Sequence, residues 1–204
     1  MGYTKKAMAT RQRIIDTASQ LFFTKGFART KLDEILLIAK VRKGNFYYYF
    51  RSKDDLALAV IRETGRPLVL DWVRSLVDPE ADPRDNLSKL AEHLMDTEMV
   101  RGGQGNPLSN LALEMSTLSE DFRRELDMVM SEVVGIFAEQ IERGIARGGL
   151  EISGQARHSA AFLVSVIEGS MLLFRLNRNE QLLRDHVDFA LNSILRSNPL
   201  AKAS

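Results

Sequence analysis

A cluster of basic, amide and aromatic side chains lies between residues 42 and 49 of the chain. Arg42 and Lys43 carry positive charges, Asn45 carries an amide, and three tyrosines follow at positions 47–49. Asparagine can donate to and accept from the edge of adenine, while arginine and lysine suit guanine or a phosphate. Tyrosine hydroxyls can also donate to phosphate oxygens. The residue types and their spacing therefore predict a surface that binds DNA.

Residues 30–50 predict the two short helices that would hold these side chains. The first has a small apolar face, and we expect Thr30 to cap it with Asp33 at the capping-box position. The second would run from about 42 to 48, with Val41 and Phe46 in the core. Helix–turn–helix motifs place such a second helix in the major groove, where residues near its N-terminus reach base edges.

This segment resembles the N-terminal signature of the TetR family of bacterial transcriptional regulators. The resemblance covers about residues 11–60 and implies an all-helical, dimeric protein that usually acts as a ligand-released repressor. Lys40 stands where the turn usually has glycine, and Arg42 stands where serine or threonine is common. The matching residues are Thr30, Ile35, Ala39, Val41, Lys43, Gly44, Phe46, Tyr47, Tyr49, Phe50, Lys53 and Leu56.

The candidate DNA contacts come from the resemblance and from the residue types. The resemblance implies contacts to DNA bases or backbone at Thr30, Lys43, Tyr47, Tyr49 and Lys53. The residue types add basic, amide and aromatic side chains of the same segment, namely Lys31, Arg42, Asn45 and Tyr48. For each tyrosine the alternative is a half-buried ring whose hydroxyl lies in water.

The charges divide the chain into a basic end and an acidic remainder. Residues 1–53 contain 12 Lys/Arg and 3 Asp/Glu, whereas residues 54–204 contain 16 Lys/Arg and 24 Asp/Glu, which gives the net charge of +1. A basic end of this kind suits a polyanion. We therefore predict a DNA-binding domain at 1–53 and a ligand-binding and dimerisation domain at 54–204, linked by a helix that begins at Lys53. Residues 1–9 are either a frayed terminus or a DNA-contacting arm.

Apolar residues at helical spacing predict an all-α fold of about nine helices. Gly26 is placed as a helix stop, and Pro67 predicts a bend in one long helix. Residues 150–154 read as a short extended connector. Besides the pair at 30–50, the expected helices cover about 10–25, 53–77, 83–99, 107–115, 120–147, 155–176 and 180–195.

The last two helices, at about 155–195, predict a homodimer interface. The run from Ala160 to Phe174 is apolar on nearly all sides, and such a helix must be buried all round. An isologous dimer would meet this need by forming a four-helix bundle with the symmetry mate, which is also how the family dimerises. Gly169 and Ser170 would permit close helix approach. The alternative is a central helix of a monomer.

A methionine-rich interior predicts an adaptable cavity for a small, mainly apolar or aromatic effector. The resemblance implies a ligand site among the central helices, although a methionine stripe is also typical of an ordinary core. Glu114 and Glu168 are each either a cavity carboxylate or a surface or paired one. The candidate pocket residues are Trp72, Met95, Met99, Leu111, Met115, Phe137 and Met171.

Several classes of chemistry lack the residues they need. The chain has no cysteine, which excludes disulfides, thiolate zinc sites and thiol-based redox or electrophile sensing. Its three histidines, at 93, 158 and 186, form no metal or catalytic pattern, so we expect no metal, cofactor or enzymatic activity. Without a signal peptide or an uncharged apolar run near ~20 residues, we expect a cytoplasmic protein with no membrane contact.

The sequence also permits two other interpretations of its function. The charge distribution also permits an architectural or interaction module that binds DNA without sequence preference. A helical enzyme or carrier whose basic end is incidental is the third interpretation.

Overall fold

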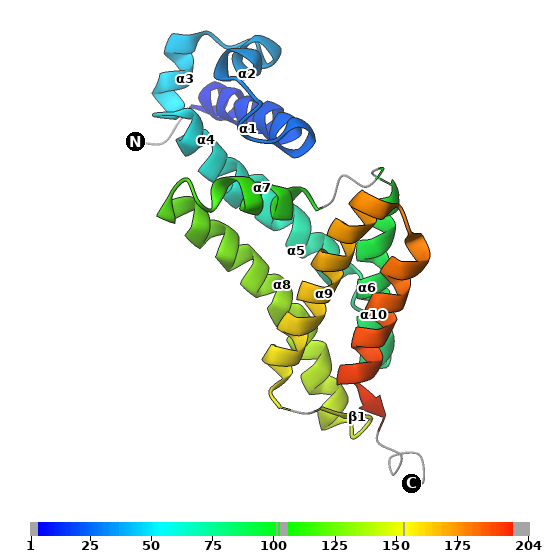
Figure 1. Cartoon of the computed structure of the whole chain (residues 1–204). Helices are drawn as coiled ribbons and strands as arrows, with labels where there is room; N and C mark the ends of the chain where they lie inside the picture. Colours follow the sequence, from blue (N-terminus) through cyan, green and yellow to red (C-terminus); the bar gives the residue numbers. More distant parts are fainter. Residues whose placement is uncertain (1–3, 101, 103–105, 153, 198–204) are drawn as a thin grey trace. The chain divides into compact units, whose positions relative to one another are not determined.

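The computed structural model describes residues 4–100, 102, 106–152 and 154–197, without the side chains of 97–100 and 196–197. These residues form the expected all-α fold apart from one two-stranded ladder (Figure 1). The helical elements are α1 (Lys5–Lys25), α2 (Leu32–Ala39), α3 (Lys43–Tyr49), α4 (Lys53–Val60), the π-helical segment η1 (Ile61–Gly65), α5 (Arg66–Ser75), α6 (Pro83–Val100), α7 (Pro107–Met115), α8 (Glu120–Ala146), α9 (Ala156–Asn177) and α10 (Glu180–Ile194).

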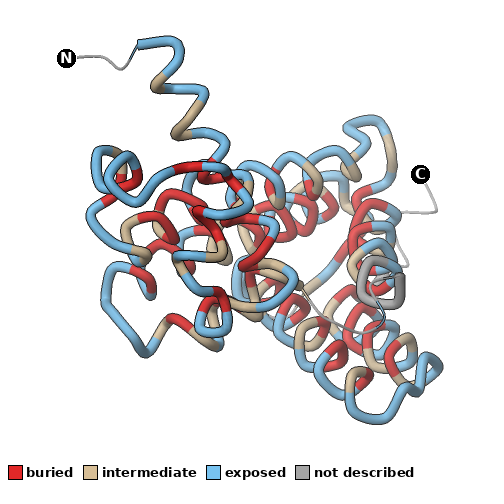
Figure 2. The backbone as a smooth tube through the Cα atoms, turned by 90° about the horizontal axis from the view of Figure 1, so that it is seen from above, coloured by how far each residue is buried: buried red, intermediate tan, exposed pale blue. Residues whose placement is uncertain are grey.

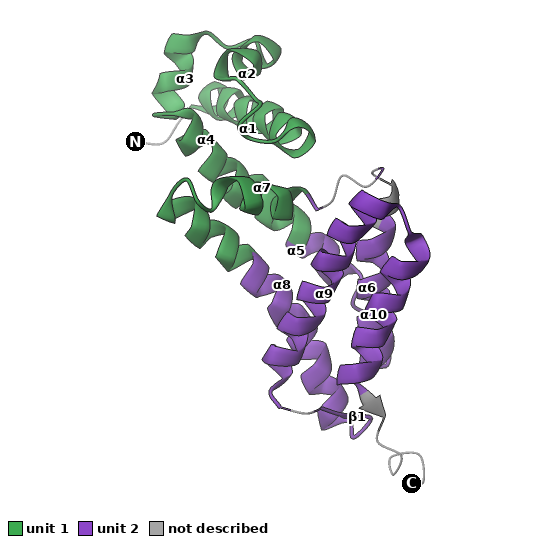
Figure 3. Ribbon diagram, viewed as in Figure 1, with its two compact units in different colours: residues 1–69, 107–129 green, residues 70–106, 130–204 purple. Residues whose placement is uncertain are grey.

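The contacts divide the chain into two compact units, which Figure 3 shows in green and purple. Unit 1 comprises residues 1–69 and 107–129, and unit 2 comprises residues 70–106 and 130–204. The expected boundary at residue 53 is therefore not where the contacts separate. Unit 1 extends further because Leu108, Leu111 and Phe122 are buried in the same hydrophobic cluster as Ile14 and Phe46. Figure 2 colours the buried positions along the backbone in red.

The first helix begins earlier than predicted. Thr4 caps α1, with its Oγ1 accepting a hydrogen bond of 3.3 Å from the Ala7 N–H, so residues 5–9 continue the helix and form no separate arm. The predicted stop is confirmed at Gly26, which has a φ of +84° and whose N–H donates to the carbonyl of Phe22. Residues 1–3 of the predicted arm lie outside the described residues.

The predicted long helix after residue 53 is confirmed, but it contains a π-helical segment where the sequence predicted a bend at Pro67. Ser52 caps α4, accepting from the Asp55 N–H at 3.1 Å. The helical backbone then passes through the π segment into α5, and the Arg66 N–H donates to the carbonyl of Ile61, five residues back. Pro67 has no N–H to donate, so a regular α-helix would leave a carbonyl in the preceding turn unpaired. The π turn just before Pro67 contains one extra residue and accommodates this loss.

Unit 2 begins its helices where the capping signals predict. Asp82 accepts from the Arg84 N–H at 2.8 Å, and α6 starts at Pro83. The connector after α8 forms a strand, β1 (Leu150–Glu151), which pairs antiparallel with β2 (Arg196–Ser197). The sequence indicated an extended connector but not its partner, because the partner strand lies beyond the last predicted helix.

Helix α9 has one face against α6 and α10 and one exposed apolar stripe. Leu163, Ile167 and Met171 belong to its buried face. The stripe repeats at helical spacing through Phe162, Ser165, Gly169, Leu172, Leu173 and Leu176, all of which are exposed. Ser170, expected beside Gly169 at a close helix approach, is instead buried and hydrogen-bonded to His186 at 3.3 Å.

Among the described residues, α9 is long and apolar enough by length and composition to cross a membrane, which the sequence did not indicate. Its buried face packs within unit 2, and 44% of the apolar window is buried inside the chain.

Candidate DNA-recognition surface

The turn between α2 and α3 closes without the glycine that usually occupies it. Lys40 adopts the left-handed conformation with φ 54° and ψ 45°. Its neighbour Val41 donates its N–H to the carbonyl of Leu36 at 3.0 Å, the long bond of a Schellman motif. The helix–turn–helix geometry is therefore intact, and the Lys40 ammonium adds a positive charge at the turn.

Helix α3 exposes nearly all the side chains predicted to meet DNA. Its Phe46 is fully buried and fixes which face points outward. Arg42, Lys43, Asn45, Tyr47 and Tyr48 are exposed, whereas Tyr49 is half-buried. The exposed surface of this short helix and its N-cap thus carries two cations, an amide and two aromatic rings.

The start of α3 leaves its polar side chains available. Arg42 is the N-cap residue but makes no side-chain cap bond. Within the part of the chain that the structure describes, Lys43 forms one long exposed ion pair, with 3.9 Å between its Nζ and Oδ1 of Asp33. Within the described chain, no hydrogen bond holds the side chain of Asn45. These side chains can therefore turn toward a ligand without breaking a strong internal contact.

The structure gives Thr30 a different role from the predicted cap. Lys31, which is exposed, is the N-cap residue of α2, and its side chain makes no cap bond. Thr30 is fully buried, and its hydroxyl donates to the carbonyl of Gly26 at 2.7 Å. The hydroxyl forms its hydrogen bond at the end of α1 because the Gly26 carbonyl has no partner within the helix there. The Thr30 side chain therefore supports the turn and is withdrawn from the proposed DNA contacts.

Lys53 also supports the motif from within. Its ammonium donates to the carbonyls of Phe27 and Thr30 at 3.0 and 3.1 Å, and it lies 4.0 Å from the ring centroid of Phe27. Lys53 is half-buried, so it ties the start of α4 to the segment before α2. Any contact that it makes with DNA has to coexist with these two hydrogen bonds.

No local sequence pattern predicted the carboxylate that holds the turn after α1. Glu114 of α7 accepts from the N–H groups of Phe27 and Ala28 at 2.8 and 2.6 Å. A Cβ at Gly26 would lie 2.9 Å from its Oε2, so glycine also makes room for it. Of the two alternatives for Glu114, the paired carboxylate is confirmed, with backbone groups as its partners.

Gly44, like Glu114, belongs to the candidate site but was not among the predicted DNA contacts. The sequence placed it only among the residues that match the family signature. It is helical and exposed, and a Cβ built on it meets nothing within 4 Å. The fold therefore places no steric demand for glycine here, although glycine costs a helix about 1 kcal/mol relative to alanine. Close approach of a ligand to the α3 backbone would account for the residue.

Gly44→Ala is expected to keep or raise the melting temperature while weakening DNA binding, because the added methyl group would stand between α3 and the DNA. Thermal melting and fluorescence anisotropy with operator DNA would measure the two effects. Gly135→Ala in α8, where a Cβ lies no closer than 3.9 Å to a neighbouring atom, is the matched control. Unchanged operator affinity in Gly44→Ala would show that DNA does not approach this residue.

The candidate pocket residues fall into both units. Leu111 and Met115 are buried in the core of unit 1. Met95, Phe137 and Met171 are buried in unit 2, where Trp72 is half-buried. The side chain of Met99 lies outside the described residues. Glu168, the other carboxylate considered for a cavity, accepts from the Asn106 amide at 3.3 Å.

A basic helix–turn–helix within an all-helical chain defines a class of protein, the DNA-binding transcriptional regulators. Two family models match the sequence. Residues 14–60 match the model for bacterial regulatory proteins of the tetR family, and residues 79–188 match the LmrA/YxaF-like transcriptional regulator C-terminal domain. The chain belongs to the TetR family of bacterial transcriptional regulators, which are not enzymes.

Full-length relatives show the same kinship. An uncharacterized HTH-type regulator in the lacX 3′ region of Lactococcus lactis is 29% identical over 90% of this chain and 92% of its own length. The transcriptional repressor NemR of Escherichia coli is 26% identical over 91% of this chain and 94% of its own. A crystal structure of the reduced form of E. coli NemR superposes with a TM-score of 0.81 over 93% of this chain and 99% of that one.

Proposed function

We propose that the protein is a homodimeric repressor that binds a palindromic operator and is released by a small, mainly apolar or aromatic effector. The observation that carries this proposal is that Arg42, Lys43 and Asn45 are all exposed at the start of α3. Phosphate contacts alone would need only cations, whereas an amide beside an arginine suits the reading of base edges. A cytoplasmic location is part of the proposal, since that is where a bacterial operator lies.

We propose that the two subunits meet through α9 and α10. The support is the exposed stripe on α9, together with Phe189 on α10, whose exposed fraction is 74%. Gly169 lies within the stripe, and a Cβ there would meet nothing within 4 Å of its own chain. An isologous pairing would cover both copies of this surface and place two α3 helices on two half-sites.

We propose that the effector site is built around the unit 2 residues Trp72, Met95, Phe137 and Met171. Methionine and aromatic side chains make a pocket that adapts to apolar ligands. Because the chain has no cysteine, the effector acts by reversible binding and not through a thiol. A panel of aromatic and aliphatic compounds, screened by the rise in melting temperature, would test this, and Phe137→Ala should reduce the rise for any compound that binds here.

Selection of DNA sequences by the purified protein, followed by a salt titration, tests the proposed function. We expect enrichment of an inverted repeat that binds far more tightly than random DNA, with affinity falling steeply as salt rises. If no sequence is enriched and binding depends on salt alone, the protein is a non-specific DNA-binding module and the repressor proposal is wrong.

Arg42→Ala and Asn45→Ala are each expected to relax specificity by about 1–3 kcal/mol, because each removes a contact to a base edge. Competition of the selected operator against variants at single positions would measure the change. Lys31→Ala is the matched control, since loss of a phosphate contact weakens operator and random DNA alike and reduces the salt slope by about one. Wild-type discrimination in both Arg42→Ala and Asn45→Ala would refute the assignment of α3 as the reading helix.

A further inference from the structure

The π segment between α4 and α5 contacts three other elements of unit 1 through nearly consecutive residues. Arg62 pairs with Glu125 of α8, with 2.6 Å between Nη2 and Oε1. Glu63 pairs with Arg11 of α1 through two hydrogen bonds of 2.6 Å. Gly65 is buried, and a Cβ there would lie 2.9 Å from Leu108 of α7. Short π-helical segments inside α-helices frequently occur at the functional sites of proteins.

Arg11 extends the Glu63 contact to the recognition helix. Its guanidinium carbon lies 5.2 Å from the ring centroid of Phe50, the residue that ends α3. The Phe50 ring in turn lies 5.6 Å from that of Phe46, the buried anchor of α3. The bidentate pair with Glu63 orients the guanidinium that lies beside Phe50, so a chain of contacts leads from the π segment to the end of α3.

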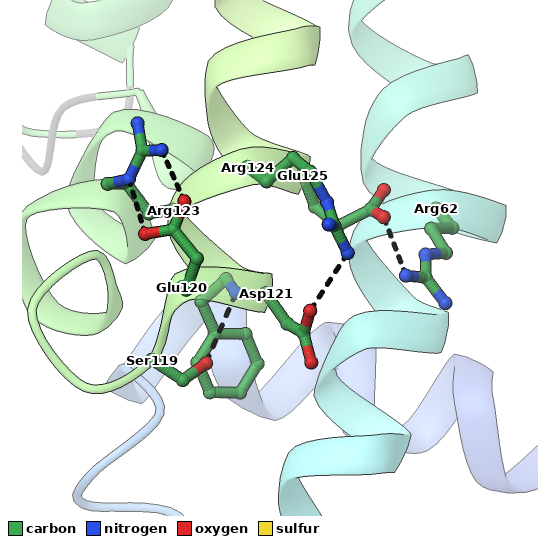
Figure 4. Close-up of polar contacts among 8 residues, drawn as sticks. Arg62, Ser119, Glu120, Asp121, Arg123, Arg124 and Glu125 are labelled. Carbon is green, nitrogen blue, oxygen red and sulfur yellow. Dashed lines mark hydrogen bonds and ion pairs between the residues drawn. The ribbon is translucent and has the colours of Figure 1, made fainter.

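The Arg62–Glu125 pair differs from its neighbours because it joins two elements. Figure 4 shows that the Arg123–Glu120 and Arg124–Asp121 pairs lie within α8, whereas Arg62 reaches Glu125 from the neighbouring helix. Glu125 is buried, so its carboxylate depends on this partner, and the hydrogen bond to Glu125 raises the pKa of Arg62. The Arg11 guanidinium similarly lowers the pKa of Glu63. Both shifts favour the charged forms of Arg62 and Glu63.

We propose that the π segment is the positioning element of the recognition helix, with Arg62 fixing the segment to α8 and Glu63 fixing the end of α3 through Arg11. Successive residues of a helix point in different directions, which is how neighbours on one segment reach elements on different sides. A displacement of the segment relative to α8 then moves Arg11 and Phe50. Arg11 and Glu63 act as positioning residues and need not touch DNA.

This inference rests on the proposed function, because it requires an operator whose bases α3 reads. Its test compares Glu63→Gln, Glu125→Gln and the double variant, each in the full chain. The readout is the ratio of affinities for the selected operator and for random DNA at one salt concentration. Glu120→Gln is the matched control, because it removes a carboxylate paired only within α8. Thermal melting of each variant reports whether it is folded.

Each single variant should lower the affinity ratio by about tenfold, which corresponds to one impaired base contact. The double variant should fall little further, because the two pairs act through one segment. Random-DNA affinity and the control should stay at wild-type values. If Glu63→Gln fails to fold, Arg11→Lys serves in its place, since it keeps the charge but loses the bidentate geometry.

An unchanged ratio in folded Glu63→Gln and Glu125→Gln would overturn the inference, as would a double variant whose loss equals the product of the single losses. A purely structural role would lower the melting temperature and leave the ratio unmoved, which also overturns it. Failure of the proposed function is recognised separately, because the wild-type protein itself would then show no preference for any sequence.

Discussion

Leu172→Glu is expected to convert the dimer to a monomer and to remove tight operator binding. Leu172 is at the centre of the exposed α9 stripe, with an exposed fraction of 51%. Burial of a leucine is worth about 1.5–3 kcal/mol, and in an isologous interface the substitution acts twice. The dissociation constant of the dimer should therefore rise by roughly a thousandfold, for a loss of about 4 kcal/mol. Sedimentation equilibrium and operator titration would measure the two effects.

Leu113→Glu is the matched control for this prediction. Leu113 is an exposed leucine on α7 with an exposed fraction of 76%, and it lies outside the α9 stripe. The Leu113→Glu substitution should leave both the dimer and operator binding intact. A Leu172→Glu protein that sediments as a dimer would show that the subunits meet elsewhere, and the exposed stripe would then need another explanation.

Phe46→Ala is expected to cost about 3–5 kcal/mol of unfolding free energy, because it removes a large, fully buried ring from a core that can collapse only partly. This is a large share of the 5–15 kcal/mol that stabilises a typical domain. Urea denaturation followed by circular dichroism would measure the loss. DNA binding should decline with it, since Phe46 sets the outward face of α3.

Tyr48→Ala provides the comparison on the same helix. Its side chain is exposed, with an exposed fraction of 65%, so its stability should change by no more than about 0.5 kcal/mol. Equal stability losses in Tyr48→Ala and Phe46→Ala would mean that α3 faces the other way, and the assignment of every exposed residue on it would fail.

Local patterns predicted the recognition motif well. The turn before α3, the burial of Phe46 and the start of α4 after Ser52 all follow from capping, periodicity and short-range sterics. Even the unusual Lys40 was interpretable, because a lysine can adopt a left-handed conformation at some cost. The exposed side chains of α3 follow from the same register.

Contacts between distant segments were not predictable in this way. Thr30 has the right type for a cap, but the nearby end of α1 takes its hydroxyl. Glu114 reaches a turn that lies far away in the sequence, and no periodicity connects the two. The π segment likewise depends on where α1, α7 and α8 lie around it. Such features are set by tertiary packing, which outweighs local preference when several elements meet.

Because unit 1 includes residues 107–129, the DNA-binding motif cannot complete its fold early in synthesis. Helices α1 to α3 leave the ribosome before α7 and α8, yet Leu111 and Phe122 complete their core, and Glu114 completes the hydrogen bonding of the turn after α1. The motif therefore remains incomplete until synthesis has passed residue 129, while the first part of unit 2 has already emerged. A nascent chain stopped before α7 would expose apolar surface to aggregation and chaperones, so the DNA-binding motif can complete its fold only after α7 and the first part of α8 have been made.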